Sequence, residues 1–438
     1  MSIKKIKISE LKIGMFIVGL DISWIRSPFL KHSRWIKKSN DIKLLTQAGV
    51  KEVSIDSNKT INQETSVANK NPQDQQNNIE KKAEEKVEEN SSIEGQQDTE
   101  VKVEAESTAQ VNIKHKETSL LDEVDSALLL KQQAREAFSN LSDSIKNNKP
   151  IHVKEVLPIV DESINSLIRN NQALLTLMHM QRREKELFAH SFSVMSLLLS
   201  LAINMGYSDE QLKKFGLAAL LHDLGWSKIP LHLLAKNKRY TENEKKVIQQ
   251  HIIIIVQQLL SAQGNDYDII QLISEHHERG DGSGYPKGMK LNEISDESSL
   301  LALVDNYDEL IHGLSDQPGV IPSLALKLLY KETLKDRFHK QQIEQLVSLL
   351  GIYPLTSAVK LDSGEKAVVF EINRNTPLKP QIKVFYDKTG RAVAQPYIID
   401  LNKDEENREI AQVLDLSDQK QDPLNLLVVK EQGLTQNG

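Results

Sequence analysis

The chain of 438 residues contains no cysteine. Disulfides, cysteine-based zinc sites and thiol nucleophiles are therefore excluded, and any metal ion would be held by histidine, aspartate or glutamate. The longest apolar runs, MSLLLSLAINM and HIIIIVQQLL, are too short to cross a bilayer, and the amino terminus lacks the apolar core of a signal peptide. No basic stripe or aromatic platform suggests a nucleic-acid polymer as partner. These absences predict a cytoplasmic protein without a membrane span.

Aromatic residues are also scarce, at 5% of the sequence, and none occurs between Trp35 and Phe138. Within that stretch, residues 61–110 concentrate acidic charge. A segment of this composition cannot bury enough apolar surface to offset the entropy lost on ordering. It predicts a disordered acidic linker over residues 61–117, which as a flexible coil of roughly 50 residues would span on the order of 40 Å.

The patterns on either side of this linker predict a mainly α protein with β-rich ends. Residues 1–60 mix short β-like runs with one helical pattern, which indicates a small α/β or β-rich domain. Residues 118–352 show helical periodicity with repeated helix-start signals, such as Thr241 and Glu244 in a capping box. Residues 353–425 read as strand pairs around glycine-containing turns, which predicts a β-rich extension. The first helical segment, LLDEVDSALLLKQQAREAFSNL, offers a surface for a homodimer.

Chemistry-bearing side chains concentrate in the helical region, where seven of the twelve histidines lie between His190 and His312. Alone, each has an ordinary explanation, since a histidine on an apolar helix usually bonds a backbone carbonyl. Asp305 is harder to dismiss, because a carboxylate within the apolar run LALVDNY needs compensation. Together the segments EKELFAH, ALLHDLG, KKVIQQH, ISEHHERGDGSGYP and ALVDNYDEL form an ordered series of nitrogen and oxygen ligands, which indicates a metal site.

This order of motifs resembles the HD-GYP family, a branch of the HD-domain metal-dependent phosphohydrolases. The resemblance covers roughly residues 120–350 and rests on HHERGDGSGYP, since the pattern HHERxDGxGYP is highly specific. It implies that the helical region is an all-helical HD-type metallophosphohydrolase domain. The run LKIGMFIVGLDISWIRSPF also resembles the small accessory domain that often precedes HD-GYP domains in bacteria.

The resemblance implies two or three bound divalent metal ions, most often iron or manganese, and hydrolysis of cyclic di-GMP. Asp223 would bridge metal ions, and Glu186, four residues before His190 and on the same helix face, would belong to an optional third site. Mixed imidazole and carboxylate ligands suit iron and manganese, but they also suit zinc. The implied ligands are Glu186, His190, His222, Asp223, His251, His276, His277 and Asp305.

The resemblance also implies residues that handle the substrate. Asp223 and Asp308 would take part in catalysis. The loop residues Gly284, Tyr285 and Pro286 would form the family signature beside the bound group. The family usually reads HDxGK, whereas HDLGW places Trp226 where that phosphate-assisting lysine would stand. Lys228, two residues further on, is the candidate substitute.

A second departure follows the last ligand motif. The family normally has an Arg-Pro-Tyr-Arg-like segment there, whose cations contact the substrate phosphate. This chain has IHGLSDQPGVIPS, with no arginine between Arg279 and Arg337, and it has Gly280 where the family has tryptophan after HHER. Each lost charge-assisted hydrogen bond is typically worth about 1.5–3 kcal/mol. Metal binding is predicted to be intact and phosphate binding to be weakened.

Three functions are compatible with these observations. The first is a phosphodiesterase that hydrolyses cyclic di-GMP to the linear dinucleotide or to GMP. The second is a catalytically weak or inactive signalling module that keeps its metals and senses a nucleotide or binds protein partners. The third is an HD hydrolase that acts on another nucleotide. The complete ligand series favours the enzyme, whereas Trp226 and the missing arginines favour the module.

Overall fold

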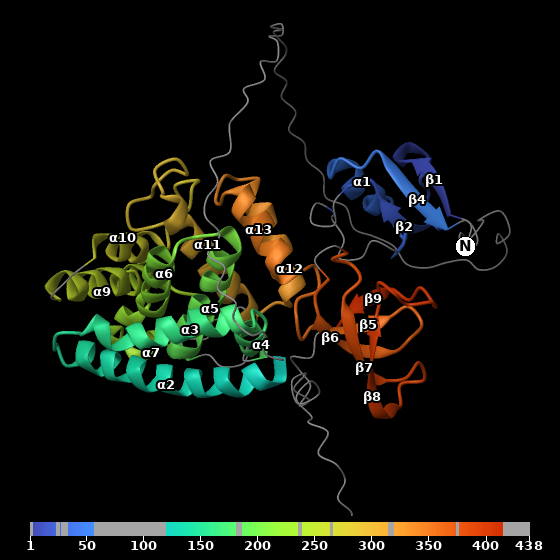
Figure 1. Cartoon of the computed structure of the whole chain (residues 1–438). Coiled ribbons are helices and arrows are strands. Elements are labelled where there is room, and N and C mark those ends of the chain that lie inside the picture. Colours follow the sequence, from blue (N-terminus) through green and yellow to red (C-terminus); the bar gives the residue numbers. More distant parts are fainter. Residues whose placement is uncertain are drawn as a thin grey trace, which may run out of the picture.

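The computed structural model describes residues 3–22, 27, 34–56, 120–180, 186–234, 239–262, 266–313, 319–373 and 376–414. The linker predicted over residues 61–117 lies outside these residues, as does the end of the β-rich extension after residue 414. The described chain is mainly helical, with an antiparallel sheet before and after the helices (Figure 1). This confirms the predicted fold class.

The amino-terminal part is a four-stranded antiparallel sheet with one helix and a short 3-10 turn. The strand order is β1-β4-β2-β3. Ile17, Leu45 and Val53 form the centre of its apolar core. The elements are β1 (Ile3–Lys7), η1 (Ile8–Glu10), β2 (Phe16–Leu20), β3 (Arg34–Trp35), α1 (Ser39–Gln47) and β4 (Glu52–Asp56).

The helices form one domain around a large apolar core, with a small second cluster of Ile229, Leu233 and Ile248. The expected capping box is present, since the Thr241 hydroxyl accepts from the backbone N–H of Glu244 at 3.3 Å. The helices are α2 (Leu120–Lys146), α3 (Leu157–Arg169), α4 (Ala173–Met180), α5 (Leu187–Met205), α6 (Asp209–Leu221), α7 (Leu231–Leu234), α8 (Glu242–Ile248), α9 (Gln250–Ser261), α10 (Tyr267–Glu275), α11 (Asp296–His312), α12 (Pro322–Thr333) and α13 (Lys340–Leu350), with 3-10 segments η4 (Val153–Val156) and η5 (Leu224–Lys228).

Helix α5 runs through the middle of this domain and packs against α6 and α11. By length and composition it is the described helix that could cross a membrane. Its most apolar stretch is 78% buried among the other helices, so it serves here as the core helix of the domain.

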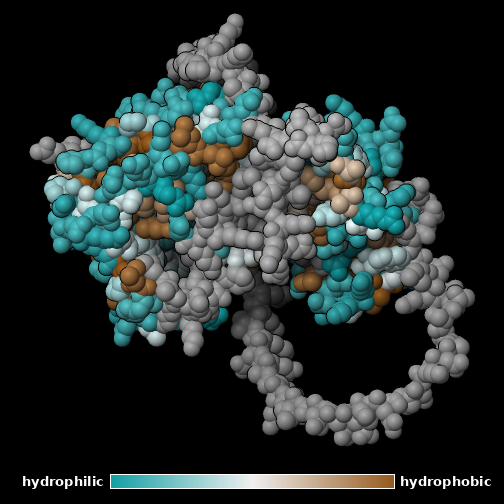
Figure 2. Space-filling view, turned by 90° about the horizontal axis from the view of Figure 1, so that it is seen from below, coloured by the Kyte–Doolittle hydropathy of each residue, from teal (hydrophilic) through white to brown (hydrophobic). Residues whose placement is uncertain are grey.

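The long helix α2 lies along the lower edge of the domain in Figure 1. Figure 2 views the molecule from that side, where hydrophobic patches interrupt a mostly hydrophilic surface. Leu128 and Leu129 of α2 are exposed by 43% and 58%.

The carboxy-terminal sheet has five antiparallel strands in the order β8-β7-β6-β5-β9. Both strand pairs expected from the sequence are present, and Gly364 and Gly390 turn with positive φ values of 111° and 85°. Glycine is favoured at such angles because it has no Cβ. The strands are β5 (Ala358–Leu361), β6 (Lys366–Glu371), β7 (Gln381–Tyr386), β8 (Ala392–Asp400) and β9 (Ile410–Val413).

Candidate metal centre

Seven of the eight predicted ligand side chains gather in the helical domain, because the ends of α6 and α10 meet α5, α9 and α11 there. Their ligand atoms form two groups, within each of which all atoms lie within 4.8 Å of one another. The first group consists of Asp223, His251, His276 and His277. The second consists of His190, His222 and Asp305.

Asp223 lies between the two groups. Its Oδ1 is 3.3 Å from Nε2 of His251 and 3.6 Å from Nε2 of His276. Its Oδ2 is 3.4 Å from Nε2 of His190 and 3.6 Å from Nε2 of His222. Each oxygen therefore faces a different set of imidazoles, which is the arrangement needed for a carboxylate that bridges two cations.

Backbone carbonyls orient three of these histidines. In His222, His251 and His276, Nδ1 lies 2.6–2.7 Å from the carbonyl oxygen three residues earlier in the chain. Donation to that carbonyl leaves the lone pair on Nε2, which points into the centre. Nε2 of His251 and of His276 and both oxygens of Asp305 are buried without a hydrogen-bond partner among the described residues. Buried polar atoms are normally paired, so this donor set fits divalent cations.

The local electrostatics favours the ligand-competent states of two of these residues. Burial opposes the charge on Asp223, but the surrounding imidazoles, His222 foremost, lower the pKa of its carboxyl well below the usual range. Burial lowers the pKa of His251 to about 4. An ionised carboxylate and a neutral imidazole are the forms that bind metal.

Asp308, predicted as a catalytic residue, lies behind His190. Its buried Oδ2 is 2.7 Å from Nδ1 of His190 and 3.0 Å from Nδ1 of His312. The hydrogen bond to His190 directs the other ring nitrogen, Nε2, toward the centre. His312 was not predicted as a site residue, although it stands one helical turn after Asp308 and so shares its face of α11.

This geometry predicts that Asp308→Asn weakens metal binding without emptying the centre. The amide can still accept from His190, but it loses the negative charge that makes the imidazole a stronger ligand. Loss of such an outer partner typically costs about 10–100-fold in metal affinity, and the near-isosteric amide places the expected loss near tenfold. Competition between the protein and a chelator for Mn²⁺ measures it. An unchanged affinity would show that Asp308 does not support His190.

Two predicted residues lie outside the cluster. Glu186 precedes α5 in extended backbone, so the expectation that it shares a helix face with His190 is wrong. Its side chain is 59% exposed and forms an ion pair with Arg135. Lys228 donates a hydrogen bond to the side chain of Asn148 rather than to a residue of the centre.

The glycine-rich loop packs against the same segment that carries His276 and His277. A Cβ at Gly284 would lie 2.3 Å from the backbone nitrogen of Arg279, so the loop approaches this segment too closely for a side chain. The Tyr285 ring covers the ring of His277, with centroids 4.7 Å apart. Pro286, the third loop residue expected beside the bound group, is exposed.

Glu278 fixes the same loop through hydrogen bonds to its backbone. Its buried carboxylate accepts from the backbone N–H groups of Lys287 and Met289 at 2.6 and 2.9 Å. The loop therefore forms one fixed wall of the centre.

Trp226 forms another wall. Its indole Nε1 donates to Oδ1 of Asp223 at 3.0 Å. Its ring stacks on His251, with centroids 4.9 Å apart and planes inclined by 19°. The residue that replaces the family lysine thus contacts two of the expected metal ligands directly.

A third group of candidate ligands shares two residues with the others. It consists of His277, Asp305 and Glu309, again within 4.8 Å of one another. Glu309 was not predicted as a ligand, although its position four residues after Asp305 places both on one face of α11.

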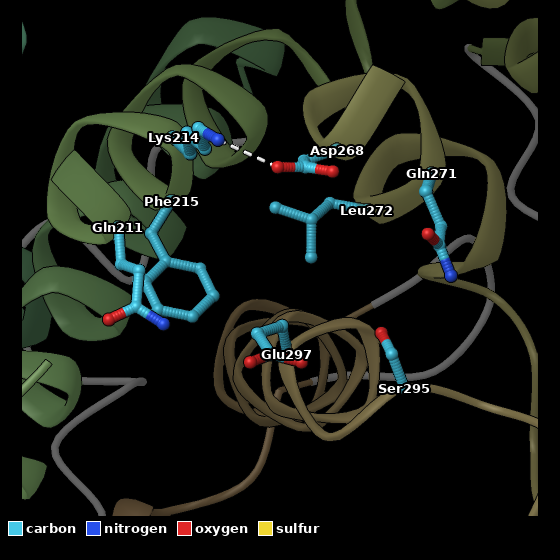
Figure 3. Close-up of a pocket in the computed structure, with 8 residues that line it drawn as sticks. All are labelled: Gln211, Lys214, Phe215, Asp268, Gln271, Leu272, Ser295 and Glu297. Carbon is cyan, nitrogen blue, oxygen red and sulfur yellow. Dashed lines mark hydrogen bonds and ion pairs between the residues drawn. The ribbon is translucent and has the colours of Figure 1, made fainter. Parts of the chain in front are cut away.

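A pocket at the opposite ends of the same helices does not supply the missing phosphate-binding cation. It lies between the first turns of α6, α10 and α11 (Figure 3). Its lysine, Lys214, forms ion pairs with Asp268 at 2.6 Å and with Glu210 at 3.3 Å. Glu297 and two glutamines complete much of the polar lining, so the pocket has no surplus positive charge among the residues drawn.

Comparison with known families assigns a description to each part of the chain. Residues 162–341 match the HD domain. Residues 3–156 match a domain of unknown function, DUF3391, and residues 358–422 match a KOW domain associated with the HD domain. HD domains bind divalent metals, in agreement with the histidine and aspartate cluster.

Three curated relatives are similar over parts of the chain. A protein named cyclic di-GMP phosphodiesterase PA4108, from Pseudomonas aeruginosa, is 27% identical over 92% of this chain and 89% of its own length. Cyclic di-GMP phosphodiesterase PdeB of Borreliella burgdorferi is 26% identical over 47% of this chain and 53% of its own. A 3'3'-cGAMP-specific phosphodiesterase of Vibrio cholerae is 28% identical over 36% of this chain and 37% of its own.

Proposed function

We propose that this chain, whose residues 162–341 match the HD domain after a DUF3391 match over residues 3–156, belongs to the HD-GYP branch of the HD-domain family and is a metal-dependent phosphodiesterase that hydrolyses cyclic di-GMP. Several curated relatives carry that activity in their names. The products are the linear dinucleotide, GMP or both.

One observation in the structure carries this proposal. The two carboxylate oxygens of Asp223 face two separate sets of imidazoles, each within 3.6 Å. A single buried carboxylate so placed would hold two cations side by side. Two adjacent divalent ions supply an activated water and stabilise the attacking and leaving oxygens of a phosphodiester.

The protein's own residues would divide the remaining work. Asp223 and Asp305 hold the ions, and the histidines of the first two groups complete their ligands. Asp308 keeps the His190 ring in the tautomer that presents Nε2. The loop with Tyr285 and the indole of Trp226 cover the centre on two sides and limit the access of bulk water. Iron or manganese is the proposed metal because the family resemblance implies it, and imidazole and carboxylate ligands suit both.

A second candidate is a nucleotide-binding module with little or no turnover. It is favoured by the nearby cationic side chains, which are either absent or already hydrogen-bonded to other groups. Trp226 replaces the lysine, Lys228 is engaged with Asn148, and the Arg279 guanidinium donates to the backbone carbonyls of His276 and Glu278. Neither the Lys228 nor the Arg279 side chain is hydrogen-bonded to a ligand side chain of the centre in the described chain.

Purified full-length protein loaded with Mn²⁺ or Fe²⁺ provides the test. We expect slow, metal-dependent hydrolysis of cyclic di-GMP, with products resolved by chromatography, and its loss in His276→Ala. Cyclic GMP-AMP is the comparison substrate, because one relative is named for it. Tight nucleotide binding without turnover by any metal form would support the module instead, and faster cleavage of cyclic GMP-AMP would change the substrate.

We propose an acidic linker at residues 61–117, an accessory domain at 1–60, a helical domain at 118–352 and a β-rich extension at 353–425. The exposed Leu128 and Leu129 of α2 are a suitable contact for a homodimer. The proposed location is the cytoplasm, where the nucleotide and any protein signalling partners would be met.

A further inference from the structure

We propose that Glu309 creates a third divalent-cation site, together with Asp305 and His277, beside the two sites that share Asp223. This inference rests on the proposed metal-dependent function of the same centre. It assigns a ligand role to a residue that neither the sequence motifs nor the family descriptions identify.

The first support is the orientation of Asp305, which is 1% exposed. Its Oδ1 lies 3.1 Å from Nε2 of His190 and 3.5 Å from Nε2 of His222. Its Oδ2 turns away from these rings and lies 3.7 Å from Nδ1 of His277. Neither oxygen has a hydrogen-bond partner among the described residues. Asp305 thus repeats the arrangement of Asp223, with one oxygen directed at each of two ligand groups.

The second support is the position of Glu309. It lies one turn after Asp305 on α11, and a carboxylate oxygen of Glu309 is within 4.8 Å of the ligand atoms of Asp305 and His277. Asn306 donates to its Oε2 at 3.2 Å, which holds the carboxylate in place. Two carboxylates this close in a buried site repel each other, so either one of them takes up a proton or a cation lies between them.

The third support is that the ligands suffice for three ions. A neutral imidazole has one unprotonated nitrogen and can bind one ion, so His277 serves either the first group or the third. If it serves the third, Asp223, His251 and His276 remain for the first ion. The second ion keeps His190, His222 and Asp305. Every ion then has at least three protein ligands, since Asp223 is shared by the first and second ions and Asp305 by the second and third.

The site takes a divalent ion that accepts oxygen and imidazole ligands, such as Mn²⁺ or Fe²⁺. It differs from the third site that the family resemblance suggested, which would need Glu186. That carboxylate is ion-paired with Arg135 and belongs to none of the ligand groups in the described chain.

Mn²⁺ stoichiometry in the full-length protein tests the inference. The variants are Glu309→Gln and Glu186→Gln, which each remove one negative charge while keeping the size of the side chain. Bound Mn²⁺ is counted by elemental analysis after equilibrium dialysis at increasing free Mn²⁺, and calorimetry follows the weakest binding step. We expect three ions at saturation in wild type and in Glu186→Gln, and two in Glu309→Gln. Circular dichroism confirms that each variant is folded.

Two results would overturn the inference: the same number of ions in Glu309→Gln as in wild type, or loss of the third ion in Glu186→Gln. Either is separable from failure of the proposed function. Wild type that binds three ions but cleaves no cyclic dinucleotide leaves the third site standing and refutes the phosphodiesterase. Wild type that cleaves the nucleotide but binds only two ions, with the same number in Glu309→Gln, refutes the third site and leaves the phosphodiesterase standing.

Discussion

Replacing Asp223 by alanine is expected to remove more bound metal than any other single substitution in the chain. Its two carboxylate oxygens contact the imidazoles of two ligand groups, so both cations lose a ligand and the negative charge that offsets their own. The loss in affinity should exceed the about 10–100-fold that is typical when only an outer partner of a ligand is removed. Hydrolysis should become undetectable, because activation of the water and stabilisation of the leaving oxygen depend on both ions.

Elemental analysis of the purified variant after dialysis measures the loss. Asp268→Asn is the matched control, since it removes a carboxylate that pairs with Lys214 in the pocket of Figure 3, at the other end of α10. The control should retain the wild-type metal content. Equal metal content in Asp223→Ala and wild type would refute the bridging role and, with it, the pairing of the two ligand groups.

The ligand cluster was predictable because its residues stand in short motifs at helix ends. His222 and His276 follow the last residues of α6 and α10, and a helix end brings its next side chains to a defined place. The strand pairs of the carboxy-terminal sheet were likewise predictable, since each turns at a glycine within a few residues. The position of β9 beside β5 depends on a return of the chain that no local pattern records.

Three features of the centre could not be predicted from the sequence. Asp308 contacts His190 across 118 residues of sequence, so its role behind the ligand is visible only when α5 and α11 pack together. Glu186 was placed on a helix because it stands four residues before His190, yet α5 begins one residue later. The contact between Trp226 and Asp223 follows from a short 3-10 turn that folds the indole back over the centre.

Because Trp226 stands where the family pattern has a lysine, Trp226→Lys should raise the turnover of cyclic di-GMP. A lysine here would place a cation beside Asp223, where the family pattern has one to assist at the phosphate. Assistance of this kind typically contributes about 10²–10⁴-fold, and a lysine introduced without its usual surroundings should recover only the low end. The gain should appear in kcat, because the cation acts on charge that develops in the transition state.

The substitution also removes two contacts, the indole hydrogen bond to Asp223 and the stacking on His251. Trp226→Phe separates these effects, since it keeps an aromatic ring over His251 but provides neither the N–H nor a cation. We expect Trp226→Phe to match wild type in kcat, and both variants to retain their metal. A gain in Trp226→Phe equal to that in Trp226→Lys would mean that the indole itself limits turnover in the wild type, and not the lack of a phosphate-binding cation. If Trp226→Lys keeps its metal and gains nothing, the missing lysine does not explain slow turnover, and the nucleotide-binding module becomes the better account of this chain.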